Sequence, residues 1–330
     1  MAMTKTLSNT AQVHKIVSGP AGRIHLVEQG SGPLVLLVHG FPESWYSWRH
    51  QLPALAAAGY RAVSVDVRGY GRSSRPADAS SYRLLELADD AAATVAALGA
   101  KSAVIIGHDW GGAVATTAAL AHPDLFRAVA HLSIPFTPLP GPPPAEMLAQ
   151  MSFGDQEHYM SYFQAPGIAE SEIEPDVRGW LRGFYAALAG DTQPGPDAPP
   201  PVFVTKGGGK LRDRFPATRP RHLTEADLDV YVAEFERTGL TGALNRYRAM
   251  GRDWEDLGAY ANQPITQPSL FIGGKLDGTT MMLLDATKAF PQTMPGNQGV
   301  HLLDGGHWIQ QECPDEVNQL LTGWLADLPH

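Results

Sequence analysis

The chain has 330 residues, of which 44% are hydrophobic and 18% charged, and its formal net charge is −9. This balance is ordinary for a globular protein, and it argues against nucleic acid or an anionic membrane as a partner, since both require basic patches. No apolar run could span a bilayer, and residues 1–10 lack the apolar core of a secretory signal. A single cysteine, Cys313, excludes an intrachain disulfide, so we expect a cytoplasmic protein in which this thiol is buried and inert.

Strand-like and helix-like stretches alternate along the chain. Two short strands are predicted at 13–17 and 23–29, and the all-apolar run at 34–38 is typical of a strand buried on both faces of a parallel sheet. Helices are predicted at 45–58 and 84–98. Further strands are predicted at 61–67, 102–107, 128–134, 269–272 and 299–303. The alternation predicts an α/β fold with a mostly parallel, eight-stranded sheet and helices on both faces.

The middle of the chain has a different character. Proline-dense segments at 135–144 and 193–201 cannot lie inside a helix or a sheet, and helical, aromatic stretches lie between and after them. Strand character returns only with the last two predicted strands. We therefore expect a helical cap at 137–251, inserted into a discontinuous core formed by 1–136 and 252–330. The second proline-rich segment is either a loop over the site or an interface.

The predicted strand at 102–107 leads into the sequence GHDWGG (107–112) and then into a helix of small residues. Strand, G-x-nucleophile-x-G and helix form the pattern of a nucleophile elbow, with Asp109 at a helix N-terminus that favours an anion. An aspartate that only caps the helix is the alternative. As a nucleophile at saturated carbon, a carboxylate forms an ester that water can cleave, whereas serine would form a stable ether. Asp109 therefore indicates attack on an epoxide or a haloalkane and argues against an esterase.

The sequence HGFPES (39–44) follows the apolar strand at 34–38. In folds with such an elbow, the loop after this strand supplies one amide to the oxyanion hole, and the residue after the nucleophile supplies the other. This rule predicts that the backbone N–H groups of Phe41 and Trp110 form the oxyanion hole. Pro42 cannot contribute, since it has no N–H. We expect Trp110, Phe41 and Pro42 to line the substrate pocket as well.

A general base and its acid partner are expected after the last strands. His307 follows the final predicted strand beside two glycines, and the order nucleophile, acid, histidine suits a base at this place. Asp277 would hold the histidine in the required tautomer, with a turn-forming aspartate as the alternative. Asp285 and Asp304 are weaker candidates, because one lies in a predicted helix and the other adjoins the histidine loop.

With these residues in place, the chain resembles an epoxide hydrolase of the α/β-hydrolase superfamily. The matching core segments, in the family's order, are HGFPES, VDVRGYGRSSRP (65–76), GHDWGG and DGGHW (304–308). In the expected cap, HYMSYFQAPG (158–167) and GALNRYR (242–248) resemble the segments that carry the family's two ring-opening tyrosines. The resemblance implies that these tyrosines are Tyr159 and Tyr247.

The resemblance also implies a reaction, the conversion of an epoxide to a vicinal diol. Asp109 would attack a ring carbon while Tyr159 and Tyr247 bind the oxygen, and His307, oriented by Asp277, would activate the water that cleaves the ester. No cofactor or metal is required, and the sequence holds no HExxH motif or His/Cys cluster. The expected partners are a small apolar epoxide and water, and monomer and homodimer both stay open.

Two other functions remain as alternatives. A haloalkane dehalogenase also uses an elbow aspartate, but it needs halide-binding donors where this chain has Phe41 and two cap tyrosines. A receptor without catalytic activity would bind a small apolar ligand under the cap, and it would not need five catalytic side chains. Tyr162 is expected only to pack within the cap, and no firm role is assigned to Glu43 or His108.

Overall fold

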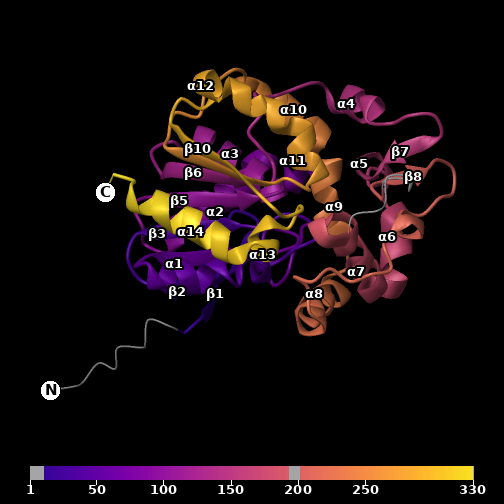
Figure 1. Ribbon diagram of the computed structural model, residues 1–330, viewed down its shortest axis with the longest axis horizontal. Coiled ribbons are helices and arrows are strands. Elements are labelled where there is room, and N and C mark those ends of the chain that lie inside the picture. The colour runs from indigo at the N-terminus through magenta and orange to yellow at the C-terminus, as the bar shows by residue number, and fades with distance from the viewer. Residues whose placement is uncertain (1–10, 193–200, 330) are drawn as a thin grey trace.

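An eight-stranded sheet forms the centre of the computed structural model, which describes residues 11–192 and 201–329 (Figure 1). The strands are β1 (Val13–Gly19), β2 (Gly22–Gly30), β3 (Leu34–Val38), β4 (Arg61–Val65), β5 (Ala103–His108), β6 (Phe126–Leu132), β9 (Ser269–Gly274) and β10 (Asn297–Leu303). Their order is β1-β2-β4-β3-β5-β6-β9-β10, with antiparallel pairing at β1–β2 and β2–β4 and parallel pairing elsewhere. The predicted mostly parallel, eight-stranded sheet is confirmed.

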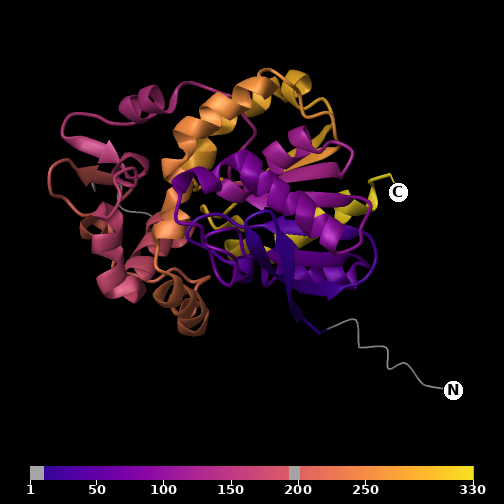
Figure 2. The ribbon, with the colours of Figure 1, turned by 180° about the vertical axis from the view of Figure 1, so that it is seen from behind.

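Helices cover both faces of this sheet, as Figures 1 and 2 show from opposite sides. The covering helices are α1 (Gln51–Ala57), α2 (Leu84–Ala97), α3 (Trp110–Ala121) and α14 (Pro314–Ala326). Strand β3 is buried throughout and divides its side chains between two cores. Leu36 and Val38 belong to the core that contains α2 and α3, while Val35 and Leu37 belong to the core that contains α1 and α14. This two-sided burial explains the apolar run, because alternate residues of a strand face opposite sides.

The helix predicted at 45–58 is wrong as one element. The structure has a 3₁₀ helix, η1 (Trp45–Trp48), followed by α1. Ser44 caps η1 by accepting a hydrogen bond from the Tyr46 amide. A continuous α-helix would need an N–H at Pro53 to reach the carbonyl four residues earlier, and proline has none. Pro53 is instead accommodated in the first turn of α1.

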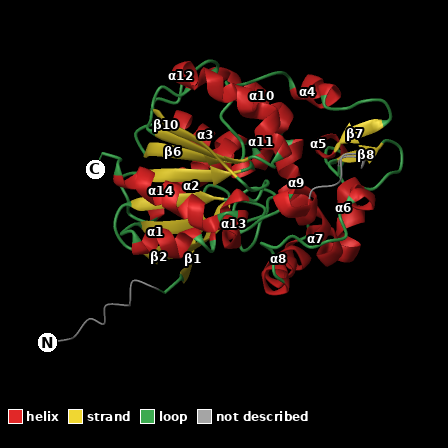
Figure 3. Cartoon of the chain, in the orientation of Figure 1, coloured by secondary structure: helices red, strands yellow, loops and turns green. Residues whose placement is uncertain are grey.

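Residues 137–192 and 201–251 form a mainly helical layer at one end of the sheet (Figures 1 and 3). Its elements are α4 (Pro144–Gln150), β7 (Gln156–His158), α5 (Tyr159–Tyr162), α6 (Ile168–Ile173), α7 (Val177–Leu188), β8 (Phe203–Thr205), α8 (Glu225–Thr238) and α9 (Thr241–Arg248). The small β7–β8 sheet was not predicted, because three-residue strands leave almost no alternating pattern. Helix α10 (Met250–Leu257) crosses the expected boundary at 251 and contacts α2, α4 and α9. The proline-rich segment at 193–201 lies, except for its last residue, outside the described residues.

Short helices complete the chain. They are α11 (Gly278–Leu283), α12 (Phe290–Thr293), α13 (Ile309–Glu312), η2 (Ala79–Tyr82), η3 (Glu174–Asp176), η4 (Gly190–Thr192), η5 (Leu211–Arg214), η6 (Gly258–Tyr260) and η7 (Leu284–Ala289). Among the described residues, none of the helices combines the length and apolar character needed to cross a bilayer.

Candidate active site

Asp109 lies on a sharp turn between β5 and α3. Its backbone has φ 54° and ψ −124°, which residues with a side chain rarely adopt. The flanking glycines are required by close backbone contacts. A Cβ on Gly107 would lie 2.0 Å from the carbonyl oxygen of Gly111, and a Cβ on Gly111 would lie 2.0 Å from that of Val38. The strained turn presents the Asp109 carboxylate at the carboxyl end of the sheet, the geometry of a nucleophile elbow.

The two oxygens of the Asp109 carboxylate face different groups. Oδ1 accepts a hydrogen bond of 2.9 Å from the Phe41 amide, and Oδ2 lies 3.6 Å from Nε2 of His307. Burial favours the neutral acid, but the His307 contact and the Phe41 amide outweigh it and lower the pKa of Asp109. The carboxylate is therefore ionised at neutral pH.

The Trp110 amide is the second donor expected in the oxyanion hole, beside the Phe41 amide. It belongs to the first turn of α3, where N–H groups have no partner within the helix.

Asp277 lies directly after β9 and caps α11. Its carboxylate accepts hydrogen bonds from the Thr279 amide (3.0 Å) and the Thr280 hydroxyl (2.8 Å). One of its oxygens also lies 3.1 Å from Nδ1 of His307. Burial opposes the charge, but His307 and the other donors lower the pKa of Asp277. The structure therefore brings the predicted acid, base and nucleophile into one contiguous row, which runs from Asp277 through His307 to Asp109.

The two weaker acid candidates face solvent instead. Asp304 pairs with Lys275 at 2.7 Å, and Asp285 pairs with Lys288 at 2.6 Å. All four side chains of these pairs are more than half exposed. Neither aspartate contacts His307, so Asp277 is the one of the three that can orient the imidazole.

His307 lies between two carboxylates. Burial lowers the pKa of this imidazole, but the charges of Asp277 and Asp109 outweigh burial and raise it well above the ordinary value. In the free protein, His307 thus carries a proton that both neighbours stabilise. The charge of this histidine is coupled to that of Asp109, since each stabilises the other.

The two tyrosines implied by the resemblance meet above this row. Tyr159 begins α5, Tyr247 lies on α9, and their ring centroids are 6.0 Å apart. Tyr247 also packs edge-on against Phe41 (5.2 Å) and Trp110 (5.3 Å), the residues whose amides are expected to form the oxyanion hole. Burial raises the pKa of both phenols, and the Asp109 carboxylate adds to the effect. Both tyrosines are therefore protonated hydrogen-bond donors at neutral pH.

Aromatic side chains form much of the surroundings. The Phe41 ring lies 5.4 Å from the Phe163 ring and 5.7 Å from the Phe184 ring, between centroids, and all three side chains are buried. Pro42 contributes its carbonyl oxygen, which accepts a hydrogen bond of 3.2 Å from the Tyr185 hydroxyl. The three aromatic rings give the site an apolar wall on the cap side.

Two residues expected to be structural have clear local environments. The Tyr162 hydroxyl donates to a Glu172 carboxylate oxygen over 2.7 Å, so it is engaged within the cap. Cys313, at the junction between α13 and α14, is half-buried rather than buried, as are its neighbours Glu312 and Pro314. Burial still raises the pKa of its thiol to about 11, which keeps it protonated and unreactive.

Sequence reasoning missed a buried chain of polar groups behind the site. Nδ1 of His108 lies 2.8 Å from a Glu43 oxygen, and its Nε2 lies 2.8 Å from the carbonyl oxygen of His307. The other Glu43 oxygen accepts hydrogen bonds of 3.0 Å from the side-chain amides of Gln310 and Gln311. These contacts connect the loop after β3 to the loop of the base. Their partners are 65 to 268 residues apart in sequence, so no local pattern could reveal them.

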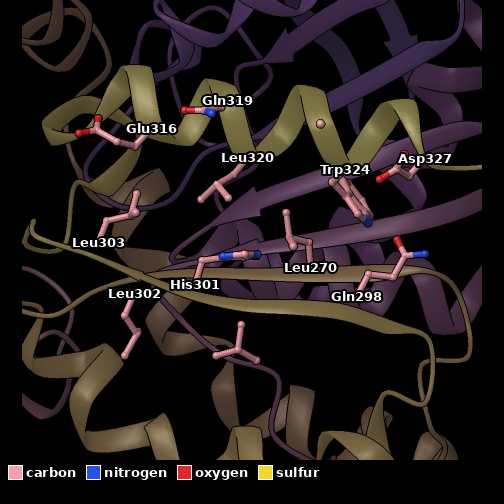
Figure 4. Close-up of a pocket in the computed structure, with 12 residues that line it drawn as sticks. Leu270, Gln298, His301, Leu302, Leu303, Glu316, Gln319, Leu320, Trp324 and Asp327 are labelled. Atoms are coloured by element: carbon pink, nitrogen blue, oxygen red, sulfur yellow. The ribbon is translucent and has the colours of Figure 1, made fainter.

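A cavity of about 870 Å³ lies away from this site, between α14, the edge strand β10 and its neighbour β9 (Figure 4). Leu270, His301, Leu320 and Trp324 are among its lining residues, and no predicted site residue lines it. Within residues 11–192 and 201–329, no three His, Cys, Asp or Glu side chains are grouped to hold a metal ion.

The family described as alpha/beta hydrolase fold matches residues 33–193. Epoxide hydrolase B of Mycobacterium tuberculosis is 41% identical, over 96% of this chain and 99% of that protein. The chain belongs to the epoxide hydrolase family. Among solved structures, an epoxide hydrolase from an endophytic Streptomyces is 60% identical, with a TM-score of 0.93 over 96% of this chain and 95% of that one. Epoxide hydrolase A from Mycobacterium thermoresistibile is 40% identical, with a TM-score of 0.89 over 97% and 99% of the two chains.

Proposed function

We propose that this epoxide hydrolase family member converts small apolar epoxides to vicinal diols through an ester on Asp109. The observation that carries the proposal is the placement of an ionised carboxylate, rather than a hydroxyl, at the elbow. That carboxylate lies below two protonated phenols and 3.6 Å from a histidine backed by Asp277. A nucleophile, acids for the leaving oxygen and a base for water are thereby present in one site.

In the first half-reaction, Oδ2 of Asp109 attacks a ring carbon of the epoxide. The carbon–oxygen bond breaks, and its electron pair moves to the ring oxygen, which takes a proton from Tyr159 or Tyr247. The product stays attached as a hydroxyalkyl ester. Oδ1 meanwhile keeps its hydrogen bond to the Phe41 amide, which leaves Oδ2 free to react.

In the second half-reaction, His307 takes a proton from water while the oxygen attacks the ester carbonyl carbon of Asp109. Negative charge then develops on Oδ1, next to the amides of Phe41 and Trp110. Collapse of this intermediate breaks the ester bond and releases the diol. The second hydrogen of the water passes to the departing alkoxide and completes the diol. Before this step, His307 releases to solvent the proton that it carries in the free protein, and a proton from solvent restores the tyrosine. The proton that His307 takes from water then returns the site to its starting state.

Ester formation should itself prepare His307 to act as a base. The ester removes the charge of Asp109, which is one of the two carboxylates that raise the pKa of His307. We expect the ester to hydrolyse faster as pH rises, since the neutral imidazole is the active form. The midpoint should lie below the pKa of His307 in the free enzyme. Hydrolysis of preformed ester, followed against pH, checks this; a midpoint equal to or above the free-enzyme pKa would contradict the coupling.

The activity is tested by giving the enzyme an aryl epoxide and, separately, a chloroalkane. We expect diol from the epoxide and no halide from the chloroalkane, because Phe41 and two tyrosines stand where a dehalogenase needs halide donors. Halide release without diol would favour the dehalogenase. Tight binding of both compounds without turnover would favour a receptor.

The tyrosines should act on the first half-reaction. We expect Tyr247→Phe and Tyr159→Phe each to slow ester formation about 10²-fold, since each removes one donor to the developing oxyanion. Tyr162→Phe is a matched control, because its hydroxyl is bound to Glu172. Single-turnover kinetics measure the effect. Ester formation at the wild-type rate in both Tyr247→Phe and Tyr159→Phe would remove these residues from the mechanism.

The division of the chain is part of the same proposal. Residues 1–136 and 252–330 form the core that carries Asp109, Asp277 and His307, and residues 137–251 form the cap that carries both tyrosines. Because α10 spans the last boundary, its residues belong to the junction between the two. We further propose a cytoplasmic location, which the single cysteine favours.

A further inference from the structure

The carboxylate of Glu312, at the end of α13, binds the backbone on both sides of the base. Its Oε2 accepts a hydrogen bond of 2.9 Å from the Gly306 amide, and its Oε1 accepts one of 3.0 Å from the Trp308 amide. These two amides immediately precede and follow His307. A single side chain therefore holds the peptide groups that determine where the imidazole points.

The same carboxylate also binds the cap. Oε2 of Glu312 accepts a further hydrogen bond of 2.8 Å from the amide of Gly190, which lies just beyond α7. The two glycines approach so closely that a Cβ on Gly306 would lie 2.2 Å from the Gly190 nitrogen. The N–H groups of Gly190 and Gly306 thus lie close together, and both donate to the same oxygen of Glu312.

Two other contacts join the histidine loop to the end of α7. The His307 amide donates to the Leu188 carbonyl over 2.9 Å, and the Trp308 indole N–H donates to the Tyr185 carbonyl over 2.9 Å. The base is therefore fixed relative to the cap as well as to the core. Glu312 lies at the centre of this junction, where loop, cap and α13 meet.

We propose that Glu312 is a positioning residue for His307, holding the histidine loop against the cap so that Nε2 faces the ester on Asp109. The inference rests on the proposed function, because it concerns the water-activating step of that mechanism. Glu312 touches no reacting atom; it acts through the backbone of Gly306 and Trp308.

The chemistry of the junction requires a carboxylate of this length. Glutamine has one acceptor oxygen, so its NH₂ group would face either the Trp308 amide or the two glycine amides, and those donors would lose their partner. Aspartate keeps both oxygens but is shorter by one methylene. Both changes should loosen His307 and leave Asp109 and the tyrosines in place. Because His307 is needed only for ester hydrolysis, the effect should fall on that step alone.

The test compares single-turnover kinetics of wild type, Glu312→Gln and Glu312→Asp with an aryl epoxide, after circular dichroism shows which variants are folded. We expect ester hydrolysis to be about 10-fold to 100-fold slower, as for a catalytic group displaced by up to about 1 Å, with ester formation within about 2-fold of wild type. The ester on Asp109 should accumulate in the mass spectrum. Glu316→Gln, an exposed change of the same kind on α14, should match wild type.

Unchanged hydrolysis in a folded Glu312 variant would overturn the inference, and so would equal slowing of both steps, which indicates general loosening. If Glu312→Gln does not fold, the rate of ester hydrolysis in Glu312→Asp tests the inference, because this variant retains the charge and both acceptor oxygens. Wild-type enzyme that forms diol without any ester on Asp109 would instead refute the proposed mechanism, and the inference with it. The two kinds of failure are thus distinguished by the wild-type measurement.

Discussion

His307→Gln should trap the enzyme as an ester on Asp109. The histidine is needed only to deprotonate water, so the epoxide ring should still open, within about 10-fold of the wild-type rate. Ester hydrolysis should fall by about 10²-fold to 10⁴-fold, the usual contribution of a general base. Mass spectrometry of the intact protein, taken seconds after mixing with epoxide, should show one added substrate per chain.

His122→Gln provides a control, since His122 pairs with Asp89 at 2.8 Å at the surface and contacts no site residue. It should turn over without accumulating ester. If His307→Gln hydrolysed the ester at the wild-type rate, water would be activated by another group, and the row from Asp109 to Asp277 would not be a catalytic unit.

Asp109→Asn should abolish diol formation, with a loss of about 10⁴-fold to 10⁶-fold, as for removal of a covalent nucleophile. The amide oxygen of Asn can still accept the Phe41 hydrogen bond, so we expect the fold to persist. Steady-state diol formation measures the loss, and the intact-mass spectrum should show no adduct. The surface change Asp304→Asn is the matched control. Activity within about 10-fold of wild type would mean that water attacks the epoxide directly.

The nucleophile, acid and base could be predicted from sequence because each is tied to the end of a strand. The elbow glycines around Asp109 are local requirements of a strained turn, and Asp277 and His307 follow β9 and β10, the last two strands at one side of the sheet. The parallel sheet then brings these separate loops together at one edge. For Tyr159 and Tyr247, in contrast, the prediction rests on the family resemblance alone, because nothing in a helical pattern separates a tyrosine that takes part in a reaction from one that only packs.

Several contacts around the site join residues that are far apart in the sequence, and the sequence does not predict them. The Glu312 contact with Gly190 spans 122 residues, and the contact of His108 with the His307 carbonyl spans 199. Such pairs form only when the cap and two loops are folded together, so they leave no spacing signal. The helix predicted at 45–58 is wrong for a local reason, because Pro53 has no N–H with which to continue a helix from the residues before it.

A single turnover in heavy-oxygen water, with enzyme in excess over an aryl epoxide, tests the ester on Asp109 most directly. If Asp109 is the nucleophile, the diol of the first turnover carries ordinary oxygen at both positions, and heavy oxygen appears in the peptide that contains Asp109. Heavy oxygen in that first diol, with none in the peptide, would show that water opened the ring and would contradict the mechanism.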